Sequence, residues 1–173
     1  MKKNIIIGLI VAISAILIDQ VSKIIMVSYL GHEYNTVTII DGFFSLSLYY
    51  NKGAAFSMFE DNFIFLMIMT VLATVVFVYM AYHADFKTKK FYSFGVYMMI
   101  GGMVGNFIDR VFNYDQGVVD FLAFTFWDYN FAIFNIADSF LVVGVIFLLV
   151  DMLFLEHKRN KKIENNKDFN GDN

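Results

Sequence analysis

Four long apolar segments dominate the pattern of hydrophobic and polar positions along the chain. Each approaches the roughly 20 apolar residues that cross a bilayer as a helix. A segment isolated in lipid must satisfy its own backbone hydrogen bonds, so each segment is predicted to be helical. The pattern therefore predicts an α-helical integral membrane protein with four transmembrane helices, at about residues 5–28, 62–83, 91–112 and 134–155.

The positions of lysine and arginine predict how these helices are oriented. Most of the 13 basic residues flank the helices on one side of the membrane, namely Lys2, Lys3, Lys87, Lys89, Lys90, Lys158, Arg159, Lys161, Lys162 and Lys167. Cytoplasmic loops carry such an excess, so both termini are expected in the cytoplasm. No small-residue cleavage site follows the first apolar segment, which favours an uncleaved helix. We expect a single membrane domain over residues 1–155 and a polar, disordered cytoplasmic tail over 156–173.

Two segments connect the helices on the opposite, outer side. Residues 36–50 contain two strand-like runs separated by Asp41 and Gly42. An Asp-Gly pair between such runs is typical of a tight turn, so a small extracytoplasmic β-hairpin is predicted between the first two helices. Residues 113–130 are expected to form a mobile loop, in which Trp127 and Tyr129 would be anchors at the membrane interface.

The composition agrees with a membrane protein and excludes several kinds of chemistry. Of the 173 residues, 58% are hydrophobic, more than the roughly 45–50% that is usual in soluble domains. The chain contains no cysteine, so it has no disulfide, thiol nucleophile or Cys-ligated metal. A net charge of −3 does not suggest a nucleic-acid partner.

Polar residues in and beside the apolar segments gather at one level. On the predicted orientation they lie toward the outer side, although different helices and loops contribute them: Asp19, Lys23, Asn106, Asp109, Arg110, Asp120, Asn135 and Asp138. Ionisable residues are rare inside membrane spans and are usually functional. This shared level is the main indication of a functional site.

Several of these residues also have ordinary structural explanations. Asp19 and Lys23 are four residues apart, so they could form an ion pair on one helix face. Gly101 and Gly105 form a GxxxG pattern, which is typical of close helix packing. Arg110 could extend its side chain to the membrane interface or organise nearby carboxylates.

Asp120 and Asp138 allow both kinds of interpretation. If Asn135 caps the fourth helix, Asp138 lies at its third position, where the helix dipole favours a negative charge. Asp120 could be an ordinary loop acid. Two carboxyls at short range, however, share a proton, and such a pair cleaves amides without a metal or cofactor. Spacing alone leaves Asp109 as a competitor of Asp120, although we expect Asp109 to pair with Arg110 or another polar group.

Other catalytic chemistries fit the sequence less well. The three histidines, His32, His83 and His157, are scattered and show no metal-binding spacing. Ser139 has no base nearby in the sequence and no nucleophile-elbow motif around it. No phosphate-binding or dinucleotide fingerprint occurs. We therefore expect acid-based chemistry without a metal or a cofactor.

Five short motifs, in this order, resemble those of the bacterial lipoprotein signal peptidases, also called signal peptidase II. They are DQVSK, YNKGAAFS, GGMVGNFIDR, VVDF and FNIADS. They extend from Asp19 to Ser139, and the four-helix layout extends the similarity to about residue 155. The resemblance implies an aspartic endopeptidase of the bacterial cytoplasmic membrane. Such enzymes remove signal peptides from diacylglyceryl-modified prolipoproteins by cutting before the lipidated cysteine.

The resemblance also assigns roles to individual residues. It implies that Asp120 and Asp138 are the catalytic dyad. Substrate-binding or supporting roles fall to the other matching residues, which are Asn51, Gly53, Asn106, Arg110, Asn135, Asp19 and Lys23. It implies lipid-modified prolipoproteins and membrane lipids as partners, a monomer, no metal and no cofactor.

Two other functional classes remain open on the sequence alone. A small proton-coupled transporter would also place Asp and Lys residues within the membrane. However, the charges lie at one level, and no inverted halves with matching helix breaks are visible. A non-catalytic assembly factor would use its acids only to bind partners, so Asp→Asn substitutions would have mild effects.

Overall fold

The computed structural model describes residues 2–53, 62–127 and 129–161. Over these residues the helices are α1 (Lys2–Leu30), α2 (Phe63–Tyr82), α3 (Lys90–Phe112) and α4 (Ile136–Val150). A short π-helix, η2 (Asp151–Leu155), continues α4. In this part of the chain four helices are long and apolar enough to cross a membrane. The prediction of a multi-pass α-helical membrane protein is therefore confirmed.

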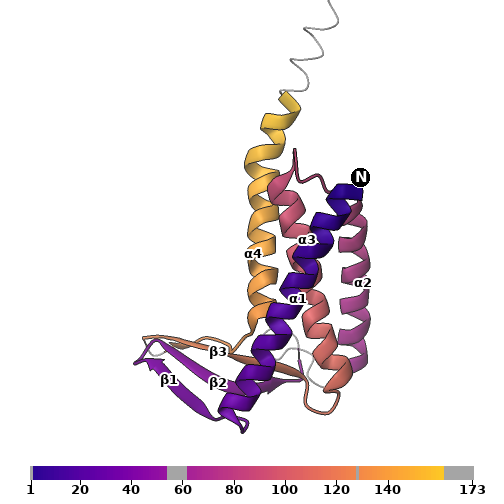
Figure 1. The fold of residues 1–173 in the computed structure, drawn as a ribbon. Helices are drawn as coiled ribbons and strands as arrows, with labels where there is room; N and C mark the ends of the chain where they lie inside the picture. Colours follow the sequence, from indigo (N-terminus) through magenta and orange to yellow (C-terminus); the bar gives the residue numbers. More distant parts are fainter. Residues whose placement is uncertain (1, 54–61, 128, 162–173) are drawn as a thin grey trace, which may run out of the picture.

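Helix α3 lies between the other helices, where glycines allow close approach (Figure 1). A Cβ atom added at Gly101 would lie 2.6 Å from the Cβ atom of Ala15 in α1. A Cβ atom added at Gly102 would lie 2.6 Å from the carbonyl oxygen of Ala137 in α4. Small residues thus bring α1 and α4 close to neighbouring faces of α3, and Gly101 belongs to the GxxxG pattern that predicts such packing.

The sheet and the N-terminus lie at opposite ends of the helical bundle. Figure 1 shows the N-terminus beside the α2–α3 connection and the far end of α4, with the strands beyond the other end. The strands are β1 (Thr36–Ile40), β2 (Phe44–Asn51), β3 (Val118–Phe126) and β4 (Tyr129–Asn130). They form an antiparallel sheet in the order β1-β2-β3-β4. The predicted hairpin between the first two helices is confirmed as β1 and β2, with Gly42 at φ +67 in the turn.

Strand β3 corrects the prediction of a mobile loop over 113–130. It pairs with β2 along much of its length, from Phe44 opposite Phe124 to Asn51 opposite Val118. Gly117 precedes it at φ +99, where an added Cβ atom would lie 2.4 Å from the carbonyl oxygen of Asn51. Most of the predicted loop is therefore part of the sheet, and glycine is required where it enters.

One apolar cluster fixes the sheet against the end of α1. It comprises the buried residues Leu30, Leu48, Val119 and Phe121. Since Val119 and Phe121 are the neighbours of Asp120 in β3, their burial holds this strand firmly beside the bundle. Trp127 lies exposed in the turn after β3, and Tyr129 is exposed in β4.

The fourth helix continues beyond the end that the sequence predicts. Residues 156–161 remain helical, and Arg159 donates hydrogen bonds to both carboxylate oxygens of Asp151, at 2.8 and 2.6 Å. This pair ties the extension to η2. The remainder of the expected tail, 162–173, lies outside the described residues, as do residues 54–57 of the YNKGAAFS motif.

Candidate active site

The start of α4 places Asp138 by a local capping arrangement. Asn135 has extended backbone geometry, and its side-chain oxygen accepts a hydrogen bond from the Asp138 N–H at 2.9 Å. In return, the Asn135 N–H donates to the Asp138 carboxylate at 3.2 Å. This is a capping box, which satisfies two N–H groups that a helix terminus leaves without partners. Asp138 thus completes the capping box formed by the N-cap residue Asn135, and it also lines the pocket described below.

Strand pairing places Asp120 on the other side of the same pocket. Asp120 lies opposite Tyr49 in the β2–β3 register. Its Oδ2 accepts a hydrogen bond from the Asn51 amide at 3.0 Å, and its Oδ1 accepts one from the Asn135 amide at 2.7 Å. The Asn51 side-chain oxygen accepts from the Gly53 N–H at 2.9 Å, which turns the Asn51 amide nitrogen toward the carboxyl.

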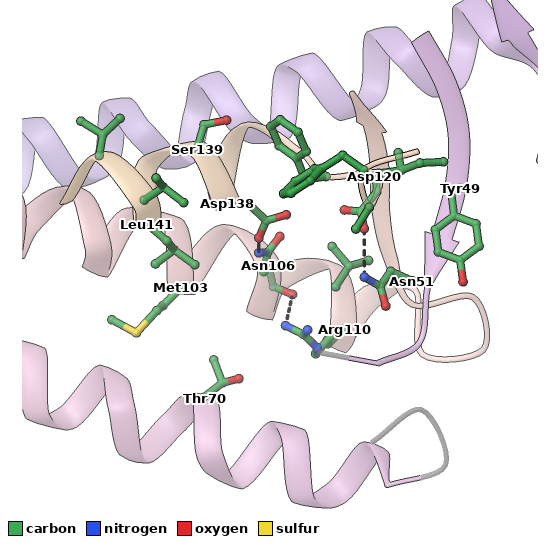
Figure 2. A pocket seen from close by; sticks show the side chains of 17 residues that line it. Tyr49, Asn51, Thr70, Met103, Asn106, Arg110, Asp120, Asp138, Ser139 and Leu141 are labelled. Carbon is green, nitrogen blue, oxygen red and sulfur yellow. Dashed lines mark hydrogen bonds between the residues drawn. The ribbon is translucent and has the colours of Figure 1, made fainter. Parts of the chain in front are cut away.

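Two buried asparagines connect the two carboxyls. Asn135 contacts Asp120 through its side-chain amide and Asp138 through its backbone N–H. Asn106 donates to Asp138 at 2.8 Å (Figure 2). The Asn106 side-chain oxygen accepts from Asn135 at 2.9 Å and from Lys23 at 3.0 Å. Because a lysine ammonium group only donates, it fixes the orientation of the Asn106 amide. The amides therefore present N–H groups to both carboxyls.

The surroundings of Asp120 favour its protonated form. Its exposed fraction is 1%. Burial, followed by the negative charge of Asp138, raises the pKa of Asp120 to about 7. Hydrogen bonds from Asn51 and Asn135 and the charge of Lys23 act in the opposite direction. Two interacting carboxyls of this kind can carry one proton between them at neutral pH.

The pocket that contains both carboxyls has a volume of about 950 Å³. Its polar end is formed by Asp120, Asp138 and the residues around them, and it continues between apolar helix faces (Figure 2). The Arg110 guanidinium lines it and donates to the carbonyl oxygens of Gly53 at 3.1 Å and Asn106 at 3.5 Å. A pocket of this shape can hold an apolar segment with one peptide bond beside the carboxyls.

The remaining candidate residues lie behind this pocket. Lys23 forms ion pairs with Asp19 at 2.8 Å and with Asp109 at 2.9 Å. The structure thus contains the expected Asp19–Lys23 pair, and it assigns Asp109 a partner on α1 instead of its neighbour Arg110. Within the described residues no group of three or more His, Asp or Glu side chains could hold a metal ion.

The structure brings together the residues singled out in the sequence. Asn51, Asn106, Arg110, Asp120 and Asp138 line the pocket. Asn135 bonds to both carboxyls, the Gly53 carbonyl is bound by Arg110, and Asp19 and Lys23 are linked to Asp138 through Asn106.

Two further polar residues were not recognised from the sequence. Thr70 of α2 contributes to the pocket wall. Gln20 donates to Asp19, to Asp109 and to the Gly105 carbonyl, at 3.1, 3.0 and 3.1 Å. Gln20 stands beside Asp19 in the DQVSK motif, and this position was the available signal for it.

Comparisons with known proteins agree on one family. Residues 11–154 match the sequence model of a family described as signal peptidase (SPase) II. The chain is 40% identical over 157 residues to a lipoprotein signal peptidase of Bacillus pumilus, covering 88% of this chain and 96% of that protein.

Two solved structures, each described as a bacterial membrane enzyme, are also similar. The one at 2.3 Å resolution has a TM-score of 0.75 and 31% identity, and the match covers 84% of this chain and 87% of that chain. The one at 1.9 Å has a TM-score of 0.73 and 30% identity, with coverage of 86% and 93%.

Proposed function

The chain belongs to the signal peptidase II family, and we propose that Asp120 and Asp138 are the catalytic dyad through which it acts. As a member of this family it is a membrane-embedded aspartic endopeptidase that removes signal peptides from prolipoproteins. The observation that carries the assignment of the dyad is the position of two carboxyls on one pocket, joined through Asn135.

The two carboxyls have different roles in the proposed reaction. Asp120, whose pKa is raised to about 7, holds the shared proton and donates it to the oxygen of the scissile carbonyl. Asp138 accepts a proton from a water molecule, whose oxygen forms a bond to the carbonyl carbon. When the resulting gem-diol intermediate collapses, the C–N bond breaks, the leaving nitrogen takes the proton from Asp138, and one hydroxyl group returns a proton to Asp120 as the carboxylic acid forms. The dyad then carries one proton again. No metal or cofactor is required for these steps.

The supporting residues hold the carboxyls in fixed orientations. Asn51, Asn106 and Asn135 each donate to a dyad carboxyl. Arg110 holds the Gly53 carbonyl, so it fixes the backbone that follows Asn51. Preorganised donors of this kind need little rearrangement during the reaction, which is why they contribute to catalysis.

The substrate class follows from the family and suits the pocket. We propose that the enzyme cuts diacylglyceryl-modified prolipoproteins before the lipidated cysteine. The apolar part of the pocket, where α2, α3 and α4 contribute Thr70, Met103 and Leu141 (Figure 2), would then hold the signal peptide or its acyl chains. The β1–β2 hairpin and residues 51–56 could form a platform over the substrate, although 54–56 lie outside the described residues.

The proposed location is the bacterial cytoplasmic membrane, with both termini in the cytoplasm and the active site toward the outer face. The excess of Lys and Arg beside the helix ends opposite the sheet supports this orientation. We further propose that residues 1–155 act as one domain, that the enzyme is a monomer, and that it contacts membrane lipids as well as substrate.

Cleavage of a purified, diacylglyceryl-modified prolipoprotein by the enzyme in detergent tests the dyad. We expect Asp120→Asn and Asp138→Asn to lower the rate at least about 10²–10⁴-fold, the usual contribution of a general acid or base. Glu156→Gln is a matched control, because Glu156 is an exposed acid beyond η2, at the end of the bundle opposite the sheet, and it should cleave like the unmodified enzyme. Appreciable cleavage by either dyad variant would contradict the assignment, provided that the unmodified enzyme cuts the same substrate.

A further inference from the structure

Asp109 is bonded to the backbone immediately before Asp120. Its Oδ2 accepts a hydrogen bond from the Val119 N–H at 3.0 Å, and both residues are buried. The carbonyl of the same Val119 accepts from the Asn135 side chain at 3.3 Å. The peptide groups on either side of Val119 are therefore held by α3 and by the residue that caps α4.

Asp19 has the same relation to Asp138. Its Oδ1 accepts a hydrogen bond from the Ala137 N–H at 2.9 Å, and the exposed fraction is 0% for both residues. Ala137 lies in the first turn of α4, where N–H groups have no partner within the helix. A carboxylate at this place is also favoured by the helix dipole. Asp19 thus binds the start of α4 from a different helix.

Lys23 and Gln20 join these two carboxylates. Lys23 forms ion pairs with Asp19 and Asp109 at 2.8 and 2.9 Å, and its exposed fraction is 3%. The Gln20 amide nitrogen donates to the same two carboxylates, at 3.1 and 3.0 Å. Among the described residues, each of the two carboxyl groups accepts hydrogen bonds from side chains of α1 and from one backbone N–H group.

Gly105 provides the space for this arrangement. A Cβ atom added there would lie 2.6 Å from the Asp19 Oδ2 atom, whereas one added at Gly101 would meet the Ala15 side chain and the Ala12 backbone. Of the two glycines in the GxxxG pattern, only Gly105 therefore has a carboxylate against it. Gly101 allows close packing of α1 on α3, whereas Gly105 leaves space for the Asp19 carboxylate between α1, α3 and α4.

We propose that Asp19 and Asp109 are positioning residues. Each accepts a hydrogen bond from the backbone N–H of the residue that precedes one member of the dyad, and Lys23 and Gln20 connect the two carboxylates to each other. The proposal rests on the assignment of Asp120 and Asp138 as the dyad. Its consequence is that the spacing between the carboxyls is set from α1, which itself supplies no pocket-lining residue among those described. A displacement of about 1 Å in such a constellation can cost about 10²-fold in rate.

Asp19→Asn and Asp109→Asn test the proposal in the same prolipoprotein assay. An asparagine at either place presents an NH₂ group to partners that are themselves donors, so the hydrogen bonds from Lys23, Gln20 and the backbone N–H cannot all form. Loss of such outer partners typically costs about 10–100-fold. We expect kcat to fall by that amount, with KM changed by less than about twofold. In Asp109→Asn the charge of Lys23 is less compensated, so the pKa of Asp120 should fall and the alkaline limit of kcat/KM should move to lower pH.

Gly8→Ala is the matched control for general damage to the α1–α3 contact, because an added Cβ atom there would meet the Tyr97 ring of α3 at the end of α1 remote from Asp19. It should lower the unfolding temperature and leave both kcat per folded molecule and the pH profile unchanged. The proposal is overturned if Asp19→Asn and Asp109→Asn behave like Gly8→Ala, with lower stability but with kcat and the alkaline limit of the unmodified enzyme.

A second variant covers the case in which an Asp→Asn protein does not fold. Gln20→Met removes the amide bridge without leaving a buried charge unpaired, and it should lower kcat in the same direction but by less. An unchanged kcat in folded Gln20→Met, with the Asp→Asn variants unfolded, would contradict the proposal. Asp120→Asn and Asp138→Asn are assayed in parallel. If either of them cleaves, the assignment of the dyad is wrong. If both are inactive while the Asp19, Asp109 and Gln20 variants keep the kcat of the unmodified enzyme, only the positioning role is overturned.

Discussion

Two buried groups of charges lie at opposite ends of the helical bundle, and they differ in what they hold. At the end near the sheet, Lys23 pairs with Asp19 and Asp109. At the other end, Arg159 pairs with Asp151 through both carboxylate oxygens. The acid in each group is nearly inaccessible, since the exposed fraction is 0% for Asp19 and 2% for Asp151.

The partners of the two groups are different. Asp151 and Arg159 lie on one continuous helix, and the pair holds the extension of α4 to η2. The carboxylates near the sheet bond to side chains of α1 and to the backbone of β3 and α4, beside Asp120 and Asp138. Burial of charge is common to both groups and does not identify a functional site. A functional site is indicated instead by the convergence of several chain segments on the reactive residues.

The two groups of charges should differ most in the effect of removing the basic residue, which is Lys23 in one group and Arg159 in the other. Lys23→Met leaves Asp19 and Asp109 buried without a counter-ion, which should cost about 3–5 kcal/mol of stability and abolish cleavage. Arg159 is 22% exposed, so Arg159→Met leaves Asp151 closer to water and should cost less, about 1–3 kcal/mol. We expect cleavage per folded molecule to stay within about twofold for Arg159→Met. Thermal unfolding in detergent and the cleavage assay measure both effects.

The outcome of this pair of substitutions bears directly on the comparison. If folded Arg159→Met protein no longer cleaves, the charges at the far end of α4 are also coupled to the pocket. If Lys23→Met protein is folded and active, the charges near the sheet have only an ordinary structural role.

The sequence predicted the elements whose signals are local. The four apolar segments and the hairpin around Asp41 and Gly42 need no knowledge of distant residues. Strand β3 was missed because its partner β2 lies far away in the chain, although Val118–Phe126 is rich in β-branched and aromatic residues. An apolar run near a membrane is equally consistent with an interfacial loop, so only the pairing distinguishes the two.

The candidate site shows the same limit at the level of single residues. The common depth of the polar residues was predicted, and the structure brings them together. Asp109 was expected to pair with Arg110 or with another polar group, and the second alternative is the one observed, because adjacent helical residues do not face each other. The actual partners, Lys23 and Gln20, lie on another helix. Contacts between helices depend on their rotation and relative height, which hydrophobic periodicity does not determine.

The pH dependence of cleavage is the next largest expected effect. In the proposed mechanism Asp120 must carry the shared proton, and its pKa is raised to about 7. The fraction of enzyme in this form falls as pH rises through that value. We therefore expect kcat/KM to show no alkaline loss more than about one pH unit below this pKa, to be about half of its plateau at the pKa, and to fall about tenfold per pH unit well above it. A kcat/KM that stays level to pH 9 in folded enzyme would contradict the role of Asp120 as the proton donor. The Arg159→Met variant should show the unmodified profile, because its charge is remote from the pocket.

The smallest expected effect is a shift of this alkaline limit by a single hydrogen bond. The Asn51 amide donates to Asp120 at 3.0 Å and lowers its pKa. Asn51→Leu removes the donor, so the pKa of Asp120 should rise and the alkaline limit of kcat/KM should move to higher pH, by up to about one unit. Asn35→Leu is the control: the Asn35 amide donates to the Leu30 carbonyl at 2.6 Å in the connection between α1 and β1, so this substitution should leave the alkaline limit unchanged. A shift to lower pH in Asn51→Leu would mean that Asp120 has become more exposed, and that Asn51 acts by closing the pocket instead of by its hydrogen bond.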